Sequence, residues 1–197
     1  MSARRLMRAR QRGVTLVVVL VLLIASAFLG VSAAVIALQT EKASRGDRDR
    51  QIAFQAAEAA LIDAQRDIET ANTASSSRAL VMGSDSALGF PSNEQPGVCN
   101  PSSDSSGFGL CNQPVLGAAL SNASLSVPYG QFTGQKFTSG QPGLPAIPPR
   151  YVIELVPYVQ AGANVQTQSF GYRISAIGFG TNANTQVVLQ VFYRKEQ

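Results

Sequence analysis

The sequence contains no histidine and no tryptophan, and it has only two cysteines in 197 residues. Without histidine the chain lacks the commonest general base and the usual partner of a catalytic serine or cysteine. A zinc site needs three or four histidine, cysteine or carboxylate ligands in one place, and the usual set is missing. Paired carboxylates for glycoside hydrolysis cannot be placed, because Glu154 is the only acid between Asp104 and Glu196. We therefore expect no enzymatic activity, no cofactor and no metal site.

Acidic residues are also missing from the beginning of the chain, where the first acid is Glu41. Lysine and arginine number 16 against 12 acids, but five of the basic residues precede Gly13, which leaves 11 against 12 in the remainder. These five are Arg4, Arg5, Arg8, Arg10 and Arg12. The basic isoelectric point thus belongs to a short leader and not to a surface of the folded domain. We expect no nucleic-acid partner.

Charge is then absent from Val14 to Leu38, a run of 25 mostly apolar residues. As a helix this segment would be roughly 37 Å long, enough to cross a hydrocarbon core of about 30 Å. Arginines stay on the cytoplasmic side of a membrane, so the chain after Leu38 is expected on the far side. The sequence predicts a single-span protein with an outer domain.

Two other interpretations explain the same run. Ala25-Ser26-Ala27 would serve as the cleavage site of a secretory signal peptide, although the apolar run continues for 11 residues past Ala27. An ordinary uncleaved membrane anchor would also have this length and charge.

The helical pattern continues from residue 39 to 71, which contain no proline. An apolar stripe with heptad spacing follows one face of this segment and is expected to pack on a sheet of the same domain or on a neighbouring helix. Its members are Phe54, Ala57, Leu61, Ala64 and Ile68. Charged residues are expected to occupy much of the remaining, solvated surface, namely Glu58, Asp63, Arg66, Asp67 and Glu69.

The rest of the chain divides into a loop region and a strand region. Residues 72–150 are rich in Gly, Ser and Pro and contain Cys99 and Cys111, which we expect to form a disulfide in an oxidising compartment. In residues 151–197 the alternating pattern predicts antiparallel strands over Tyr151–Val156, Phe170–Ile177 and Gln186–Tyr193. The predicted fold class is α+β, with a long N-terminal helix packed on a C-terminal antiparallel sheet.

Three segments resemble a known family. They are Gln11–Leu20 (QRGVTLVVVL), Asp49–Leu61 (DRQIAFQAAEAAL) and Val188–Arg194 (VLQVFYR). A basic leader ending in glycine, followed by an apolar helix that becomes amphipathic, is similar to a type IV prepilin, and the segments together resemble the minor pilin PilX family. The strong motifs cover about residues 11–66. The resemblance implies a type IV pilin-like fold with residues 1–13 as a leader peptide.

The resemblance also implies a function in pilus assembly. A prepilin peptidase would cut between Gly13 and Val14 and methylate the new amine of Val14. The protein would lie in the inner membrane with its N-terminus cytoplasmic and its C-terminal domain periplasmic, and then enter the pilus. Its partners would be other minor pilins and a tip adhesin, and the pilus would serve twitching motility, cell adhesion or DNA uptake.

One position departs from most pilins, which carry Glu at the fifth mature position. That position is Val18 here. A charged side chain in the bilayer is costly if unpaired, so valine suits a subunit with no partner amine ahead of it, as at a pilus tip.

Two other functions are compatible with the sequence. A type II secretion pseudopilin has the same N-terminal organisation. A membrane-anchored periplasmic domain could instead bind a ligand through the loop of residues 72–149.

Overall fold

The computed structural model describes residues 14–70, 82, 90, 108–111, 120–158 and 169–194. The chain divides into two units, Met1–Gly46 and Asp47–Gln197. The predicted leader with Gly13, the end of the amphipathic segment at Ala71, and Cys99 lie outside the described residues.

A single helix, α1 (Val14–Thr70), covers both the apolar and the amphipathic segment predicted from the sequence. Two hydroxyl side chains in the apolar half bond to the helix itself, since Ser26 donates to the carbonyl of Leu23 and Ser32 to that of Phe28, each at 2.9 Å. Such internal bonds satisfy polar groups where no water is available. These two hydroxyls therefore have a hydrogen-bond partner within the helix.

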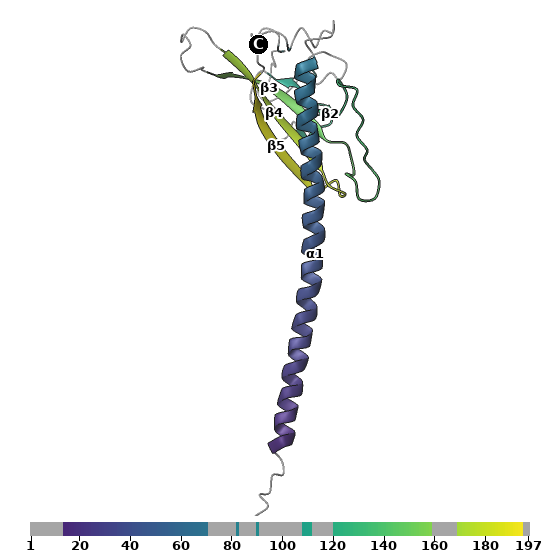
Figure 1. Cartoon of the computed structure of the whole chain (residues 1–197), viewed down its shortest axis with the longest axis vertical. Coiled ribbons are helices and arrows are strands. Elements are labelled where there is room, and N and C mark those ends of the chain that lie inside the picture. The colour runs from purple at the N-terminus through teal and green to yellow at the C-terminus, as the bar shows by residue number, and fades with distance from the viewer. Residues whose placement is uncertain are drawn as a thin grey trace, which may run out of the picture. The chain divides into compact units, whose positions relative to one another are not determined.

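The sheet contains three long strands and two short ones. The long strands β3 (Arg150–Tyr158), β4 (Ser169–Phe179) and β5 (Gln186–Tyr193) are antiparallel neighbours in that order. On the other side of β3, β2 (Val127–Pro128) pairs antiparallel and β1 (Leu110–Cys111) pairs parallel. The α+β fold predicted from the sequence is confirmed, with the part of α1 from residue 47 to 70 beside the sheet (Figure 1).

Two details of the sequence prediction need correction. The sheet is mixed and not purely antiparallel, because β1 runs parallel to β3. The long connection between them leaves room for the crossover that a parallel pair requires. The segment 72–150 is also not all loop, since β1, β2 and the first residue of β3 lie within it.

The polar half of α1 approaches the sheet through alanines. Five of them are at most 2 % exposed: Ala53, Ala56, Ala57, Ala60 and Ala64. Ile68 is fully buried and Leu61 is half-buried, but Phe54 is 42 % exposed. Phe54 therefore does not pack on the sheet of its own domain, because an α-helix drifts by about 20° per heptad and Phe54 precedes Ile68 by two heptads. Its packing on a neighbouring helix, the other expectation, stays a prediction.

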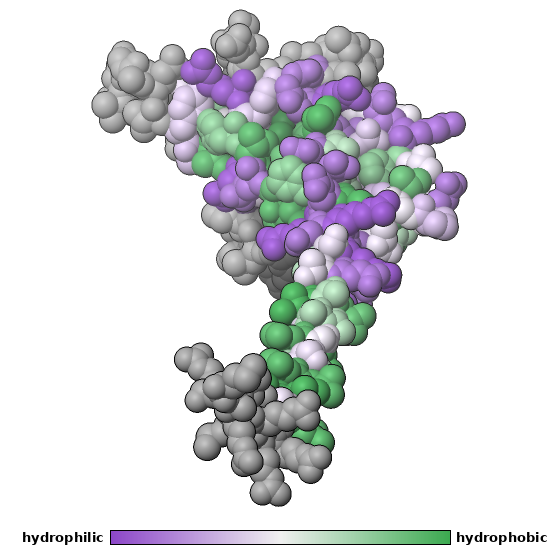
Figure 2. Space-filling model, turned by 60° about the horizontal axis from the view of Figure 1, so that its bottom comes forward, coloured by the Kyte–Doolittle hydropathy of each residue, from purple (hydrophilic) through white to green (hydrophobic). Residues whose placement is uncertain are grey.

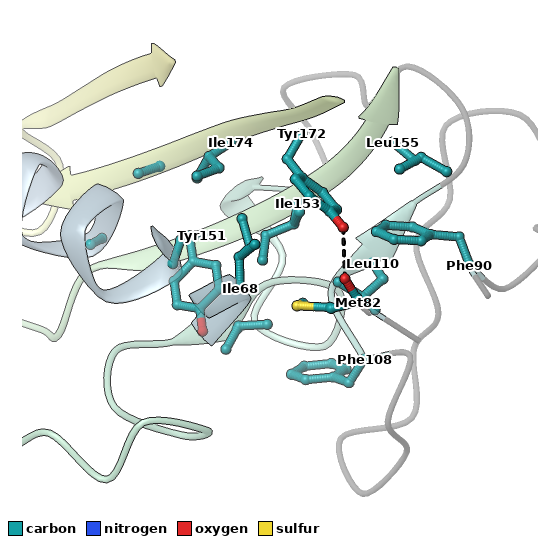
Figure 3. Packing of buried hydrophobic residues seen from close by; sticks show 14 residues of the cluster. Ile68, Met82, Phe90, Phe108, Leu110, Tyr151, Ile153, Leu155, Tyr172 and Ile174 are labelled. Atoms are coloured by element: carbon teal, nitrogen blue, oxygen red, sulfur yellow. Dashed lines mark hydrogen bonds between the residues drawn. The ribbon is translucent and has the colours of Figure 1, made fainter. Parts of the chain in front are cut away.

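The main core lies between the inner face of the sheet and α1. Figure 3 shows Ile68, Tyr151, Ile153, Ile174 and Tyr172 pointing toward one another, with the Tyr172 hydroxyl donating to the Met82 carbonyl at 2.8 Å. A second, smaller cluster contains Cys111, Leu120, Val152, Ile177 and Phe179. Strand residues alternate between the two clusters, as expected for a sheet with side chains packed on both faces.

Candidate functional site on the long helix

The first half of α1 has an apolar surface. All residues from Val14 to Leu38 are exposed, and among the described residues α1 is the one helix long and apolar enough to span a membrane. In Figure 2 the visible part of this surface is mostly green, with a few white residues between the green ones. An apolar area of this extent requires lipid or other helices around it. Val14 begins the helix and is 74 % exposed, and Val18 in the next turn is 51 % exposed.

Charged residues follow the apolar half. Arg45 and Glu41 form an ion pair at 2.5 Å, with both side chains largely exposed. Exposed pairs of this kind contribute little to stability. The pair therefore does not explain why charges alternate in sign from Arg45 to Arg50.

Asp49, within that alternating segment, contacts the turn between β4 and β5. Its Oδ1 accepts hydrogen bonds from the backbone N–H of Thr181 at 2.5 Å, from the Thr181 hydroxyl, and from the N–H of Asn182 at 3.4 Å. A Cβ on Gly180 would lie 2.5 Å from this oxygen, so the turn comes this close only because Gly180 has no side chain. The pKa of Asp49 is lowered, mainly by the hydroxyl of Thr181 and then by that of Thr185.

This hydrogen bonding predicts a pH dependence of stability. A carboxylate with a lowered pKa in the folded state stabilises the protein above its unfolded-state pKa, whose ordinary value is 3.8, and the gain is lost as the pH falls through the folded-state pKa. Asp49→Asn is expected to reduce the loss of stability between about pH 6 and about pH 3. Urea unfolding of the full chain in detergent at both pH values measures this difference in the free energy of unfolding. Asp47→Asn, two residues away and exposed, should keep the wild-type profile, and an unchanged profile in Asp49→Asn would disprove the prediction.

Two other acids of α1 are buried, against the expectation that they lie on the solvated surface. Asp63 is fully buried, and its carboxylate accepts hydrogen bonds from the Gly130 N–H at 2.7 Å and from the Thr133 hydroxyl. Asp67 is 3 % exposed and accepts a hydrogen bond from the Tyr151 hydroxyl at 2.9 Å. The helical period of 3.6 places both acids on the alanine face, and that spacing was the signal available in the sequence.

The loop that meets Asp63 depends on glycine geometry. Gly130 has a φ of 78°, and a Cβ there would lie 1.8 Å from the carbonyl oxygen of Gln135. Gly134 has a φ of 70° and its N–H donates to the Gly130 carbonyl at 2.8 Å. The left-handed backbone conformation of these two glycines makes the loop tight. The backbone N–H of Gly130 is thereby free to bond to the buried carboxylate.

A third buried acid, Glu154, lies on the other face of the sheet. It is 1 % exposed and accepts two hydrogen bonds from Arg173, its register partner on β4, at 2.6 and 2.9 Å. These bonds raise the pKa of Arg173, so the guanidinium stays charged. Bidentate pairing satisfies a carboxylate that would otherwise be costly to bury. In the part of the chain that the structure describes, Asp49, Asp63, Asp67 and Glu154 thus all hold elements of the fold together.

Cys111 ends β1 and is fully buried in the second cluster. It is disulfide-bonded. The predicted partner, Cys99, lies outside the described residues, so the pairing of these two positions stays a prediction. No group of three or more His, Cys, Asp or Glu side chains placed to hold a metal ion occurs among the described residues.

Comparison with known proteins identifies the family. The family described as PilX N-terminal matches residues 12–61, and the family described as type IV pilus assembly protein PilX, C-terminal, matches residues 91–195. Searches of curated proteins and of solved structures found no significant match. The two matched ranges include the apolar half of α1, four of the five buried alanines in its polar half (Ala53, Ala56, Ala57 and Ala60) and the five strands that the structure describes. On this basis the chain belongs to the PilX family of type IV pilus minor pilins, which are membrane-associated structural components of the pilus.

Proposed function

We propose that this minor pilin takes part in the initiation of type IV pili, in a tip or priming complex with other minor pilins and a tip adhesin. The observation that carries the proposal is the apolar half of α1, which is exposed along its whole length and whose first turn contains no acid. In the inner membrane this half is surrounded by lipid, with the leader cytoplasmic and the domain periplasmic. In the pilus the same surface packs on helices of neighbouring subunits, so little water contacts it in either place.

Release from the membrane requires removal of the leader. A prepilin peptidase cuts between Gly13 and Val14 and methylates the amine of Val14. Gly13 suits the cut because a residue without a side chain fits a narrow protease cleft. After cleavage the chain begins at the first residue of α1, so the positive amine stands at the end of the apolar surface.

Val18 supports a position at the tip. Most pilins carry a glutamate at this place, whose carboxylate can neutralise the amine of a neighbouring subunit. A buried carboxylate without such a partner would be costly. A subunit added first has no earlier subunit whose amine needs neutralising, and a valine at the fifth mature position fits that place.

The N-terminus of the membrane-extracted protein tests the proposal. Intact mass is expected to show a chain that begins at methylated Val14. An intact Met1 would indicate a plain anchor, and a chain beginning at Phe28 would indicate ordinary secretion; either result contradicts the proposal. Gly13→Leu is expected to leave the leader uncleaved, whereas Gly30→Ala, at a helix position with open space around it, should be processed normally.

A deletion strain separates pilus assembly from secretion. Loss of surface pili and of twitching in that strain, restored by the wild-type gene but not by Gly13→Leu, is the expected result. Normal piliation with defective protein secretion would identify a type II secretion pseudopilin instead.

A further inference from the structure

The polar half of α1 carries a row of exposed residues at a spacing of four. Residues four apart on a helix lie next to one another along one ridge of its surface. Such ridges are the surfaces through which helices most often pack on one another. The members of the row are Arg50, Phe54, Glu58, Ile62 and Arg66, and all five residues are exposed.

Two large apolar side chains of this row are in contact with water. Phe54 is 42 % and Ile62 is 51 % exposed, whereas the alanine face from Ala53 to Ala64 is buried. The sheet of the same domain therefore covers the alanine face and leaves the row open. Apolar residues at a helical spacing are the anchors by which one helix binds to another.

Two charged groups of the row have no partner in their own domain. Within the part of the chain that the structure describes, Arg50 and Glu58 make no ion pair and no side-chain hydrogen bond. They are eight residues apart, about 12 Å along the helix axis, so they do not pair with each other. Each can pair only with water or with a group of another molecule.

The order of the residues in the row matches a second copy of the chain. When a parallel copy is displaced by eight residues, about 12 Å, its Arg50 lies beside Glu58. Its Phe54 then lies beside Ile62, and its Glu58 lies beside Arg66. Both charged pairs are of opposite sign, and the apolar pair lies between them. An antiparallel copy centred on Phe54 matches fewer residues, because Ile62 and Arg66 then have no partner within the row.

We propose that a second copy of this chain packs on the row from Arg50 to Arg66, parallel to α1 and displaced by eight residues. Subunits that follow one another in a fibre are displaced along its axis. The contact thus rests on the proposed function for the event that brings two copies together, and it adds a further copy of the chain to the priming complex.

The small size of the row limits where this contact forms. Five side chains from each copy are far fewer than the roughly 20–30 residues per partner of a standard protein interface. Free subunits are therefore expected to stay monomeric. Copies that the membrane or the pilus holds close together have a high effective concentration, which compensates for the weak contact.

Photocrosslinking in cells tests this proposal. Two full-length copies with different epitope tags are produced together, and the first copy carries benzoylphenylalanine in place of Phe54. The expected adduct joins this residue to the second copy at or next to Ile62, as located by mass spectrometry. Benzoylphenylalanine in place of Ile147, at an exposed site (39 %) outside α1, is the matched control and should give no adduct between copies.

Charge reversal in the two copies tests the predicted ion pair. Arg50→Glu in the first copy, or Glu58→Arg in the second, should lower the adduct yield on the order of fivefold, because like charges then face one another. The two reversals together should restore the yield, since an opposite pair forms again. Arg48→Glu in the first copy, at an exposed position outside the row, should keep the wild-type yield.

Four results would overturn the proposal. They are no adduct between the two copies, an adduct at Phe54 of the second copy, an undiminished yield in both single reversals, and a yield that the combined reversals do not restore. An adduct with a different pilus subunit alone counts as the first of these. In cells that cleave the leader before Val14 and assemble pili, each of these results would leave the proposed function standing.

Discussion

Gly178→Ala is expected to destabilise the domain by about 3 kcal/mol, at the upper end of the range for an overpacked core. A Cβ at this position would lie 2.1 Å from the carbonyl oxygen of Ala53 and 2.3 Å from the backbone nitrogen of Ala57. Both atoms belong to the backbone of α1, so no side-chain rotation relieves the clash. The helix must instead move away from β4, which separates the alanine face from the sheet.

Unfolding by urea, followed through the tyrosine signal in near-UV circular dichroism, measures this loss for the full chain in detergent. The chain has no tryptophan, and Tyr151 and Tyr172 are buried in the core beside α1, so the signal reports on that packing. Gly46→Ala is the matched control, because nothing lies within 4 Å of an added Cβ there. It should be neutral or slightly stabilising, since alanine is the better helix former. Equal stability of the two variants would show that helix and sheet are not in backbone contact.

Asp63→Ala is expected to cost about 3 kcal/mol, the range for removing one partner from a buried charged hydrogen-bond network. The substitution leaves the N–H of Gly130 and the hydroxyl of Thr133 without their acceptor. Because Asp63 is fully buried, water cannot replace the carboxylate unless the loop opens. The loop from Tyr129 to Thr133 should therefore lose its fixed position on the helix.

The same urea titration measures the loss, and proteolysis of the native protein reports on the loop. Glu58→Ala is the control on the same helix, since Glu58 is exposed and its removal should change stability by no more than about 0.5 kcal/mol. Faster cleavage between residues 129 and 149 in Asp63→Ala, but not in Glu58→Ala, is expected. Identical stability and cleavage in both variants would contradict the role of Asp63 as an anchor of this loop.

The family and the overall fold were accessible from the sequence, because their signals are local. The basic leader, the uncharged run from Val14 to Leu38 and the strand patterns each depend on neighbours in the chain. Helix α1 and strands β3, β4 and β5 follow these patterns; β3 and β4 extend slightly beyond the predicted ends, and β5 has the predicted ends. The matches to the PilX family cover the same segments.

The contacts of the helix were less accessible, because apolar spacing alone does not show which side faces the sheet. The heptad pattern placed Phe54 in the stripe. In the structure the backbone of α1 lies so close to Gly178 that alanines occupy the contact, and the larger Phe54 side chain stays exposed. Asp63 was assigned to the solvated surface for its charge, whereas a loop nearly 70 residues later in the chain supplies the hydrogen bonds that make its burial possible. The residues of that loop give no local sign of their partner.

The sequence by itself determined that this protein has a long helix with an apolar and a polar half and a strand-rich C-terminal region, since hydrophobic periodicity and charge act over a few residues. Only the tertiary structure decided that the sheet is mixed, that alanines form the helix contact, that Asp49, Asp63 and Asp67 hold loops and strands on α1, and that β5 is left as an exposed edge. These features depend on pairs of residues far apart in the chain. Their free energy comes from burial and hydrogen bonds that exist only once the chain has folded.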